Sequence, residues 1–316
     1  MAYQLKEINE AVLENPQAFL ADCDRQYQEK INHAADVIIE NLEKSPIVLL
    51  SGPSGSGKTT TAMKVEEELR HRGIRCHTIS MDNYFRTLNK ETAPLTDSGE
   101  VDFESPLYMD MELLHEHFTL LGAGQEITVP KFEFTRQMRN DALGYRLKLE
   151  KNEIAIFEGI HALNDDITSR HPEATGIYIS ARSDILEGDI LRFKGTWMRL
   201  TRRAVRDYQF RGTGVEATLA MWGNVRRGEK LYISPFRHRA KVTIDSSFPY
   251  EVPVMRNFAT PLLEAVLAGV PQDNPRHDEL LNLINAFSFF EPIDPALVHP
   301  DSLLREFIGG GSYTYK

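Results

Sequence analysis

The stretch GPSGSGKTT, residues 52–60, constrains the fold of this chain more than any other feature. It fits the pattern G-x-x-x-x-G-K-[ST], it follows the apolar run PIVLLSG, and apolar residues at helical spacing come after it. Backbone N–H groups in such a loop can turn inward around phosphate oxygens, and the following helix adds its positive end. The sequence predicts a strand, a phosphate-binding loop and a helix; a glycine-rich turn without a ligand is the alternative.

We expect this loop to bind a nucleoside triphosphate, ATP or GTP. Lys58 would reach the β and γ phosphates, and Thr59 would offer its hydroxyl to Mg²⁺. The predicted nucleotide contacts within the loop are Gly52, Ser54, Gly55, Ser56, Gly57, Lys58, Thr59 and Thr60. The motif leaves open whether the terminal phosphate goes to water, to a protein or to a small molecule.

The rest of the chain alternates strand and helix patterns. Apolar runs predict further strands at 74–82, 153–159, 176–181 and 241–245. This alternation predicts an α/β fold of the three-layer P-loop NTPase type, with a parallel sheet flanked by helices and ligands at the carboxyl ends of the strands. A helix is expected at 111–121, and another with Thr260 as its cap and Pro261 at its first position.

We expect three regions: an N-terminal helical extension at 1–45, a P-loop domain at 46–270, and a helical, glycine-rich tail at 271–316. The end of the tail, REFIGGGSYTYK, could be a frayed linker or a docked flap, and the glycines favour a frayed linker.

A net charge of -10 argues against a surface built for nucleic acid or anionic lipid. The chain has two cysteines, a polar N-terminus and no run of about 20 apolar residues that could span a bilayer. These features predict a cytoplasmic protein without nucleic-acid or membrane partners.

Two acidic residues follow predicted strands at the edge that carries the loop. Asp82 could accept the proton of an acceptor hydroxyl, and Glu158 could orient magnesium. Alternatively, Asp82 satisfies turn amides and Glu158 forms an ordinary loop salt bridge. His161 could face the acceptor or merely pack.

A basic segment lies between residues 192 and 241, with 13 Lys or Arg against 3 Asp or Glu. Within it Arg199, Arg202, Arg203 and Arg206 fall on one stripe of a helix, where like charges repel and an anionic partner would offset them. We expect these arginines to bind triphosphate oxygens, with Arg203 acting in catalysis alongside Lys58. A solvated face, ion pairs with the acidic remainder of the chain, and nucleic-acid binding are the alternatives.

Six segments together resemble the uridine kinase and phosphoribulokinase family of P-loop kinases: GPSGSGKTT, SMDNYF, DFESPLYMD, VPKFEFTRQMR, IFEGIHAL and RLTRRAVRDYQFRG. The resemblance implies that Asp82 is the catalytic base, that the arginine helix is a lid over ATP, and that Glu104 contacts sugar hydroxyls in place of the usual Asp. It also implies a β-hairpin near the acceptor, formed by EITVPKFEF and YRLKLE.

The resemblance predicts acceptor contacts at Asp82, Tyr84, Glu104, Phe132, Phe134, Gln137, Arg139 and His161. Uridine kinases typically carry Tyr, Asp and His where this chain has Phe132, Glu133 and Gln137, so the base-reading side departs from the family pattern.

Together these features predict an ATP-dependent, magnesium-requiring kinase for a small hydroxyl compound. We expect the acceptor to be the 5′ hydroxyl of a nucleoside and the protein to be a homo-oligomer, as related enzymes often are. A kinase for another acceptor, such as a sugar phosphate or pantothenate, is the first alternative. A P-loop ATPase that switches a protein partner is the second.

Overall fold

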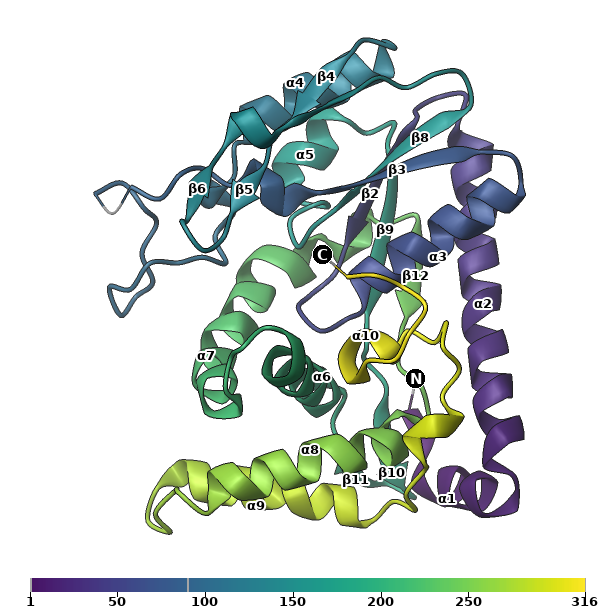
Figure 1. Ribbon diagram of the computed structural model, residues 1–316, viewed down its shortest axis with the longest axis vertical. Coiled ribbons are helices and arrows are strands. Elements are labelled where there is room, and N and C mark those ends of the chain that lie inside the picture. Colours follow the sequence, from purple (N-terminus) through teal and green to yellow (C-terminus); the bar gives the residue numbers. More distant parts are fainter. Residues whose placement is uncertain (1, 90, 316) are drawn as a thin grey trace.

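The computed structural model describes residues 2–89 and 91–315. At its centre lies a five-stranded sheet in the order β12-β9-β2-β8-β3, and every neighbouring pair is parallel (Figure 1). The strands are β2 (Ile47–Ser51), β3 (Arg75–Ser80), β8 (Glu153–Glu158), β9 (Thr175–Ser180) and β12 (Val242–Asp245). The predicted α/β fold and its five strands are confirmed.

The central strand β2 is apolar along its length because both of its faces are covered. Val48 and Leu50 lie in one core, shared with the helices α2 and α3, while Ile47 and Leu49 lie in a second core beneath α4. Strand alternation therefore sends successive residues of one apolar run into opposite cores.

Ten helices were assigned in the part of the chain that the structure describes. They are α1 (Leu5–Glu14), α2 (Pro16–Asn41), α3 (Lys58–His71), α4 (Met111–Gly122), α5 (Asp165–Arg170), α6 (Gly195–Phe210), α7 (Val215–Gly228), α8 (Glu251–Leu267), α9 (Pro275–Ser288) and α10 (Arg305–Ile308). Figure 1 shows α2 and α3 on one side of the sheet and α4 and α5 on the other. None of the helices among the described residues is long and apolar enough to cross a membrane.

Smaller sheets join the peripheral segments. Strand β1 (Ala2–Gln4) pairs with β10 (Asp184–Glu187), which pairs in turn with β11 (Ile190–Phe193). The expected hairpin is present, because β4 (Ile127–Val129) pairs antiparallel with β7 (Tyr145–Leu147). Between them, β5 (Phe132–Glu133) pairs with β6 (Met138–Arg139).

The helix expected to begin at Thr260 begins earlier, at Glu251, and Pro261 lies inside it. The preceding turns bury Val252, Val254 and Met255 in the core, and this burial holds the helix together across the proline. The prediction of Thr260 as a cap was wrong because the Thr-Pro signal outweighed the apolar spacing before it.

The C-terminal tail is docked, which corrects the expectation of a frayed linker. Leu303, Leu304 and Phe307 are fully buried in the core, and α10 packs on α6. Beyond the glycines, the Tyr313 hydroxyl donates a hydrogen bond to Glu67 Oε2 at 2.5 Å. The run LLREFI supplies enough apolar surface to hold the tail although three glycines follow it.

Candidate active site

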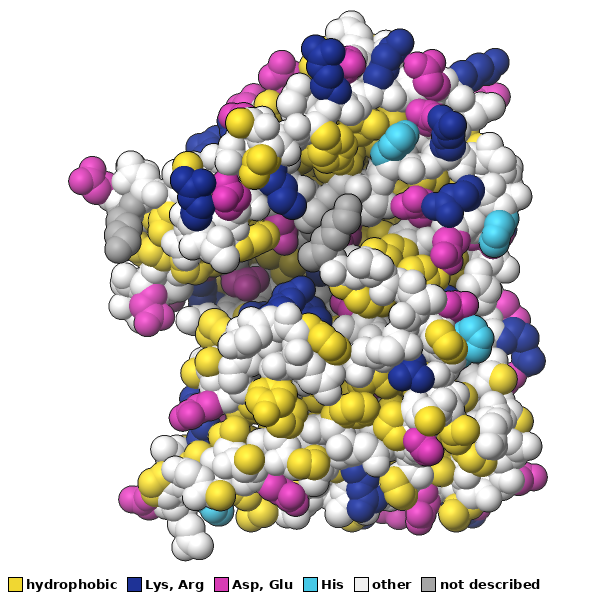
Figure 2. Space-filling model, in the orientation of Figure 1, with side chains coloured by type: hydrophobic (Ala, Val, Ile, Leu, Met, Phe, Trp, Pro, Cys, Tyr) yellow, Lys and Arg dark blue, Asp and Glu magenta, His cyan; other side chains and the backbone are white. Residues whose placement is uncertain are grey.

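A cavity of about 400 Å³ opens at the carboxyl edge of the sheet, beside the glycine-rich loop. Figure 2 shows a hollow in the surface in which cationic and acidic side chains meet. The cavity has a loop half, lined by Ser54, Gly55, Gly57, Lys58, Thr59, Arg203, Arg206, Arg211 and Glu306. It has an aromatic half, lined by Phe85, Phe103, Glu104, Tyr108, Phe132, Phe134 and Gln137, and Asp82, Glu158 and Ile160 lie between the two.

The loop adopts a conformation that depends on its glycines. Gly57 has φ +81° and stands immediately before α3, in the left-handed region that favours glycine. A Cβ on Gly52 would lie 2.1 Å from the Ile179 carbonyl oxygen, so the loop packs directly on the β9 backbone. The Lys58 ammonium donates to the Pro53 carbonyl oxygen at 3.4 Å, within the loop itself.

Three of the loop residues predicted to contact nucleotide do not line the cavity. Gly52 packs against β9, Ser56 is fully buried, and the Thr60 side chain is buried against Glu306. The structure shows the strand, loop and helix that the motif predicted, and backbone N–H groups can serve a ligand where the side chains of the same residues point inward.

Thr59 and Glu158 meet at the floor of the cavity. The Thr59 hydroxyl donates a hydrogen bond to Glu158 Oε2 at 3.2 Å. Burial raises the pKa of Glu158 to about 6, opposed by nearby Lys58 and reinforced by Asp82. Burial also raises the pKa of Asp82, opposed by Lys58 and Arg211. Two carboxyl groups therefore share a partly desolvated site in which a cation would favour their ionised forms.

This donor set fits Mg²⁺, which prefers oxygen ligands and is usually held by one or two protein groups together with substrate phosphates. Thr59 and Glu158 supply a hydroxyl and a carboxylate oxygen. Within residues 2–89 and 91–315, no group of three or more His, Cys, Asp or Glu side chains could hold a metal alone. Phosphate oxygens would have to complete such a site.

Asp82 is held at the end of β3 by a turn that does not use its carboxylate as a cap. The Ser80 hydroxyl accepts the Asp82 N–H at 3.3 Å, and Asn83 Oδ1 accepts the Phe132 N–H at 3.3 Å. These contacts satisfy the turn, and the Asp82 carboxyl group lines the cavity.

Arg203 and Arg206 project from α6 into the loop half. Arg203 Nη1 donates to Ser54 Oγ at 3.1 Å, so the helix is tied to the loop. Both guanidinium groups also bind Asp207, through Arg203 Nε at 3.2 Å and Arg206 Nη2 at 2.7 Å. Asp207, within the basic segment itself, thus offsets part of the repulsion between these arginines.

Arg199 and Arg202 do not line the cavity, which corrects their prediction as nucleotide contacts. Both side chains are buried: Arg199 binds Glu229 at 2.7 Å, and Arg202 binds Glu251 at 2.6 Å. Arg199 also donates to the carbonyl oxygen of Ser54, and Arg202 to that of Gly55. These two arginines of α6 therefore support the loop by donating hydrogen bonds to the loop's carbonyl oxygens. Their anionic partners are carboxylates of the chain itself.

The aromatic half is built from rings that contact one another edge to face. Phe85 lies 5.6 Å from Tyr108 and 5.7 Å from Phe132 between ring centroids, and Phe132 lies 5.2 Å from Phe134. Beside these rings, burial raises the pKa of Glu104 to about 7, opposed by Arg203 and Lys58.

The structure places three predicted acceptor residues away from the cavity. Tyr84 is fully buried and binds His117 Nδ1 at 2.8 Å. Arg139, in β6, forms an ion pair at 2.8 Å with Asp110, which precedes α4. His161 is buried, and burial lowers its pKa to about 4. Tyr84 and Arg139 bind partners from other elements, and both ring nitrogens of His161 are buried without a hydrogen-bond partner among the described residues.

Among the residues that depart from the family pattern, Phe132 and Gln137 line the cavity. Glu133 turns away, accepting from Asn140 Nδ2 at 2.6 Å and from Arg136 at 3.3 Å. Gln137 has φ +48°, a conformation uncommon for a residue other than glycine and often found at functional sites.

Several cavity residues were missed by the sequence analysis: Phe85, Phe103, Tyr108, Ile160 and Glu306. The first three lie in or next to segments recognised by resemblance, SMDNYF and DFESPLYMD, so their aromatic character was the available signal. Glu306 lies in the tail that was expected to fray, and no local pattern links it to the loop.

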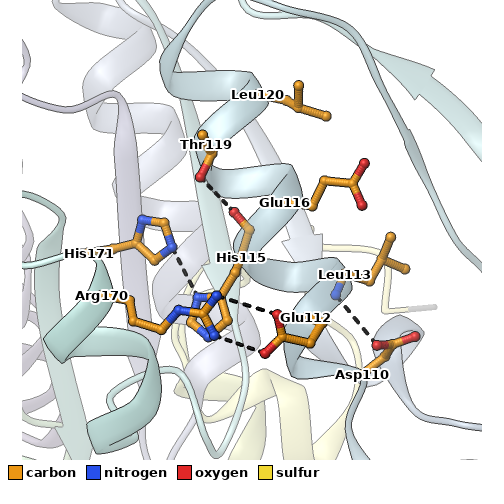
Figure 3. A pocket seen from close by; sticks show the side chains of 9 residues that line it. All are labelled: Asp110, Glu112, Leu113, His115, Glu116, Thr119, Leu120, Arg170 and His171. Carbon is orange, nitrogen blue, oxygen red and sulfur yellow. Dashed lines mark hydrogen bonds and ion pairs between the residues drawn. The ribbon is translucent and has the colours of Figure 1, made fainter.

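A second hollow lies beside α4, and none of the residues that line it also lines the first cavity (Figure 3). Its polar side chains pair with each other: His115 Nδ1 lies 3.0 Å from His171 Nε2, and Arg170 binds Glu112 at 2.9 Å. It contains no residue of the glycine-rich loop, so it is not part of the nucleotide site.

Comparisons with known proteins identify the family of this chain. Residues 47–251 match the model of the phosphoribulokinase / uridine kinase family. The uridine kinase of Halobacterium salinarum is 26% identical over 196 residues, covering 62% of this chain and 77% of that protein. The uridine kinase of Lactobacillus helveticus is 26% identical over 228 residues, covering 72% and 97%. The chain belongs to the phosphoribulokinase / uridine kinase family and is an ATP-dependent P-loop kinase.

Proposed function

We propose that this kinase transfers the terminal phosphate of ATP to the 5′ hydroxyl of a nucleoside. The observation that carries the proposal is the separation of charge within the cavity. Four cations, Lys58, Arg203, Arg206 and Arg211, line the loop half together with Glu306, whereas the charged residue lining the aromatic half is Glu104. A neutral acceptor with an aromatic ring suits the aromatic half.

The same separation disfavours the alternative acceptors. A sugar phosphate or pantothenate carries its own negative charge, and no Lys or Arg among the residues that line the aromatic half would balance it. A nucleoside offers ribose hydroxyls, which can donate hydrogen bonds to Glu104, and a base that can stack on Phe or Tyr rings. The names of the relatives, uridine kinases, support a nucleoside as well.

In this proposal the loop half holds the triphosphate. Lys58 and the loop N–H groups bind its β and γ phosphates, and Thr59 and Glu158 would hold Mg²⁺. When bound, Mg²⁺ adds positive charge beside the phosphoryl oxygens. Arg203 and Arg206 stabilise the charge that spreads over the equatorial oxygens in the transition state.

Asp82 acts as the base. It lines the cavity between the two halves, where an acceptor hydroxyl would meet the terminal phosphate. Its carboxylate accepts the hydroxyl proton as the oxygen bonds to phosphorus and the bond to the leaving ADP oxygen breaks. The cations Lys58 and Arg211 nearby favour the ionised carboxylate that this role requires.

The test is a screen of acceptors coupled to ADP release, covering nucleosides, free sugars, sugar phosphates and pantothenate. We expect a nucleoside to give the highest kcat/KM, and Lys58→Ala to abolish turnover as a control. In Asp82→Asn, kcat should fall by about 10²- to 10⁴-fold while the Kd for ATP stays within about threefold.

Two results would count against the proposal. A charged acceptor as the best substrate would contradict the proposal that the aromatic half binds a neutral nucleoside. ADP release that is equally fast without any acceptor would favour the ATPase switch. Homo-oligomerisation, a cytoplasmic location and the lack of a nucleic-acid partner stay predictions.

A further inference from the structure

The C-terminal segment 302–315 lies directly on the phosphate-binding loop and the start of α3 (Figure 1). Leu303 packs against the loop so closely that a Cβ on Gly57 would lie 2.5 Å from Leu303 Cδ1. This segment lies outside residues 47–251, the part that matches the family. Its contact with the loop is therefore a feature of this chain beyond the matched kinase core.

Glu306 brings a carboxylate to the start of α3. Its Oε2 atom lies 3.3 Å from the Thr60 N–H nitrogen and 2.5 Å from the Thr60 hydroxyl oxygen. Thr60 is in the first turn of α3, where backbone N–H groups lack partners within the helix and attract anions. Glu306 thus makes the kind of contact that a phosphate oxygen makes at such a helix end.

The position of Glu306 sets it in the loop half among the cations expected to bind polyphosphate. It lines the same cavity as Lys58 and Arg203, and its Oε1 atom lies 3.9 Å from Arg206 Nη1. A polyphosphate in the loop would bring negative charge next to this carboxylate. Phosphate and carboxylate would then compete for the Thr60 N–H group and for Arg206.

The last described residues of the chain also contact Thr60. After Gly309 and Gly310, which both have positive φ, the Tyr315 hydroxyl lies 3.1 Å from Thr60 Oγ1. Tyr313 binds Glu67 one to two turns further along α3. The tail therefore contacts α3 at several points, and Glu306 is one of them.

We propose that Glu306 is a tethered phosphate mimic: it occupies the Thr60 N–H group until the donor nucleotide displaces it. The C-terminal segment thereby lowers the affinity of the loop for nucleotide and sets the nucleotide concentration at which the kinase works. This inference rests on the proposed nucleotide site.

The test measures the Kd of MgATP by calorimetry for the full chain and for Glu306→Gln, which keeps the side-chain shape and removes the charge. We expect Glu306→Gln to bind MgATP about 10-fold more tightly, because a neutral oxygen competes less well for the N–H group. Glu279→Gln, which removes an exposed charge from α9, is the matched control and should leave the Kd unchanged.

Glu306→Asp provides a second variant if Glu306→Gln fails to fold. It keeps the charge but shortens the side chain, so that it no longer reaches Thr60, and it should also tighten binding. An unchanged or weaker affinity in the folded variants would overturn the proposal; weaker binding would mean that Glu306 contacts the nucleotide directly.

Lys58→Ala distinguishes the proposed nucleotide site from the proposed role of Glu306. If Lys58→Ala abolishes binding but Glu306→Gln changes nothing, the nucleotide site stands and the role of Glu306 as a phosphate mimic is wrong. A wild-type chain that binds no MgATP would overturn both.

Discussion

The two halves of the cavity are built in different ways. In the loop half, one contiguous motif after β2 supplies the backbone, Arg199 and Arg202 donate hydrogen bonds to its carbonyl oxygens, and α6 and the tail add charged side chains. The aromatic half collects single side chains from Phe85 to Gln137, spread over turns and short strands. Phosphate can be held by backbone groups of one segment, whereas an acceptor is recognised by side chains that several segments must bring together.

The largest effect should come from the bracing of the loop half. In Glu251→Gln, Arg202 loses its carboxylate partner in a fully buried site, and the free energy of unfolding should fall by about 3–5 kcal/mol. Chemical denaturation measures this, with Glu264→Gln, exposed on the same helix, as the control. A loss equal to that of the control would mean that the loop does not depend on this ion pair.

A second prediction concerns Glu104 in the aromatic half, where burial raises the pKa to about 7. A carboxyl group with a raised pKa stabilises the fold fully below its unfolded value of about 4.5, and this contribution is lost as the pH rises through about 7. The free energy of unfolding of Glu104→Gln, relative to wild type, should therefore increase by up to about 3 kcal/mol between pH 4.5 and pH 7. Denaturation curves at a series of pH values check this. A difference that does not change with pH would show that the Glu104 carboxyl group is not perturbed.

A smaller effect should separate the two halves directly. A Cβ on Gly228 would lie 2.4 Å from Glu104 Cβ, so Gly228→Ala should displace Glu104 and raise the KM of the acceptor about 10-fold. The KM of ATP should change less than twofold, because the three atoms nearest to the added Cβ all belong to Glu104.

The matched control for this variant is Gly223→Ala on the same helix, where an added Cβ meets nothing within 4 Å. It reports the general effect of replacing a helical glycine with alanine. Equal changes in both variants, or a KM of ATP that rises along with that of the acceptor, would mean that the halves are not separable in this way.

The sequence was sufficient to predict which residues meet at the carboxyl ends of the parallel strands. Asp82 and Glu158 lie at the ends of apolar runs, Lys58 and Thr59 follow the loop that continues from another, and the carboxyl ends of parallel strands meet at one edge. Their meeting in one cavity was predicted on that ground. For the loop half, the spacing within one motif carries most of the geometry.

Periodicity was not sufficient for the arginine helix. It placed four arginines on one stripe, but it could not show that Glu229 and Glu251, from other helical segments, cover two of them. The tail was misjudged for a related reason. Its glycines are a local signal, whereas the burial of Leu303 and Phe307 depends on distant packing. Contacts between elements far apart in the chain decide both cases.

The most direct test is a crystal structure with MgADP and the best acceptor bound. An oxygen of Asp82 should lie about 3 Å from the acceptor hydroxyl, with that hydroxyl facing the position of the terminal phosphate. An Asp82 carboxylate turned away from the hydroxyl, with another side chain in its place, would contradict the assignment on which the mechanism rests.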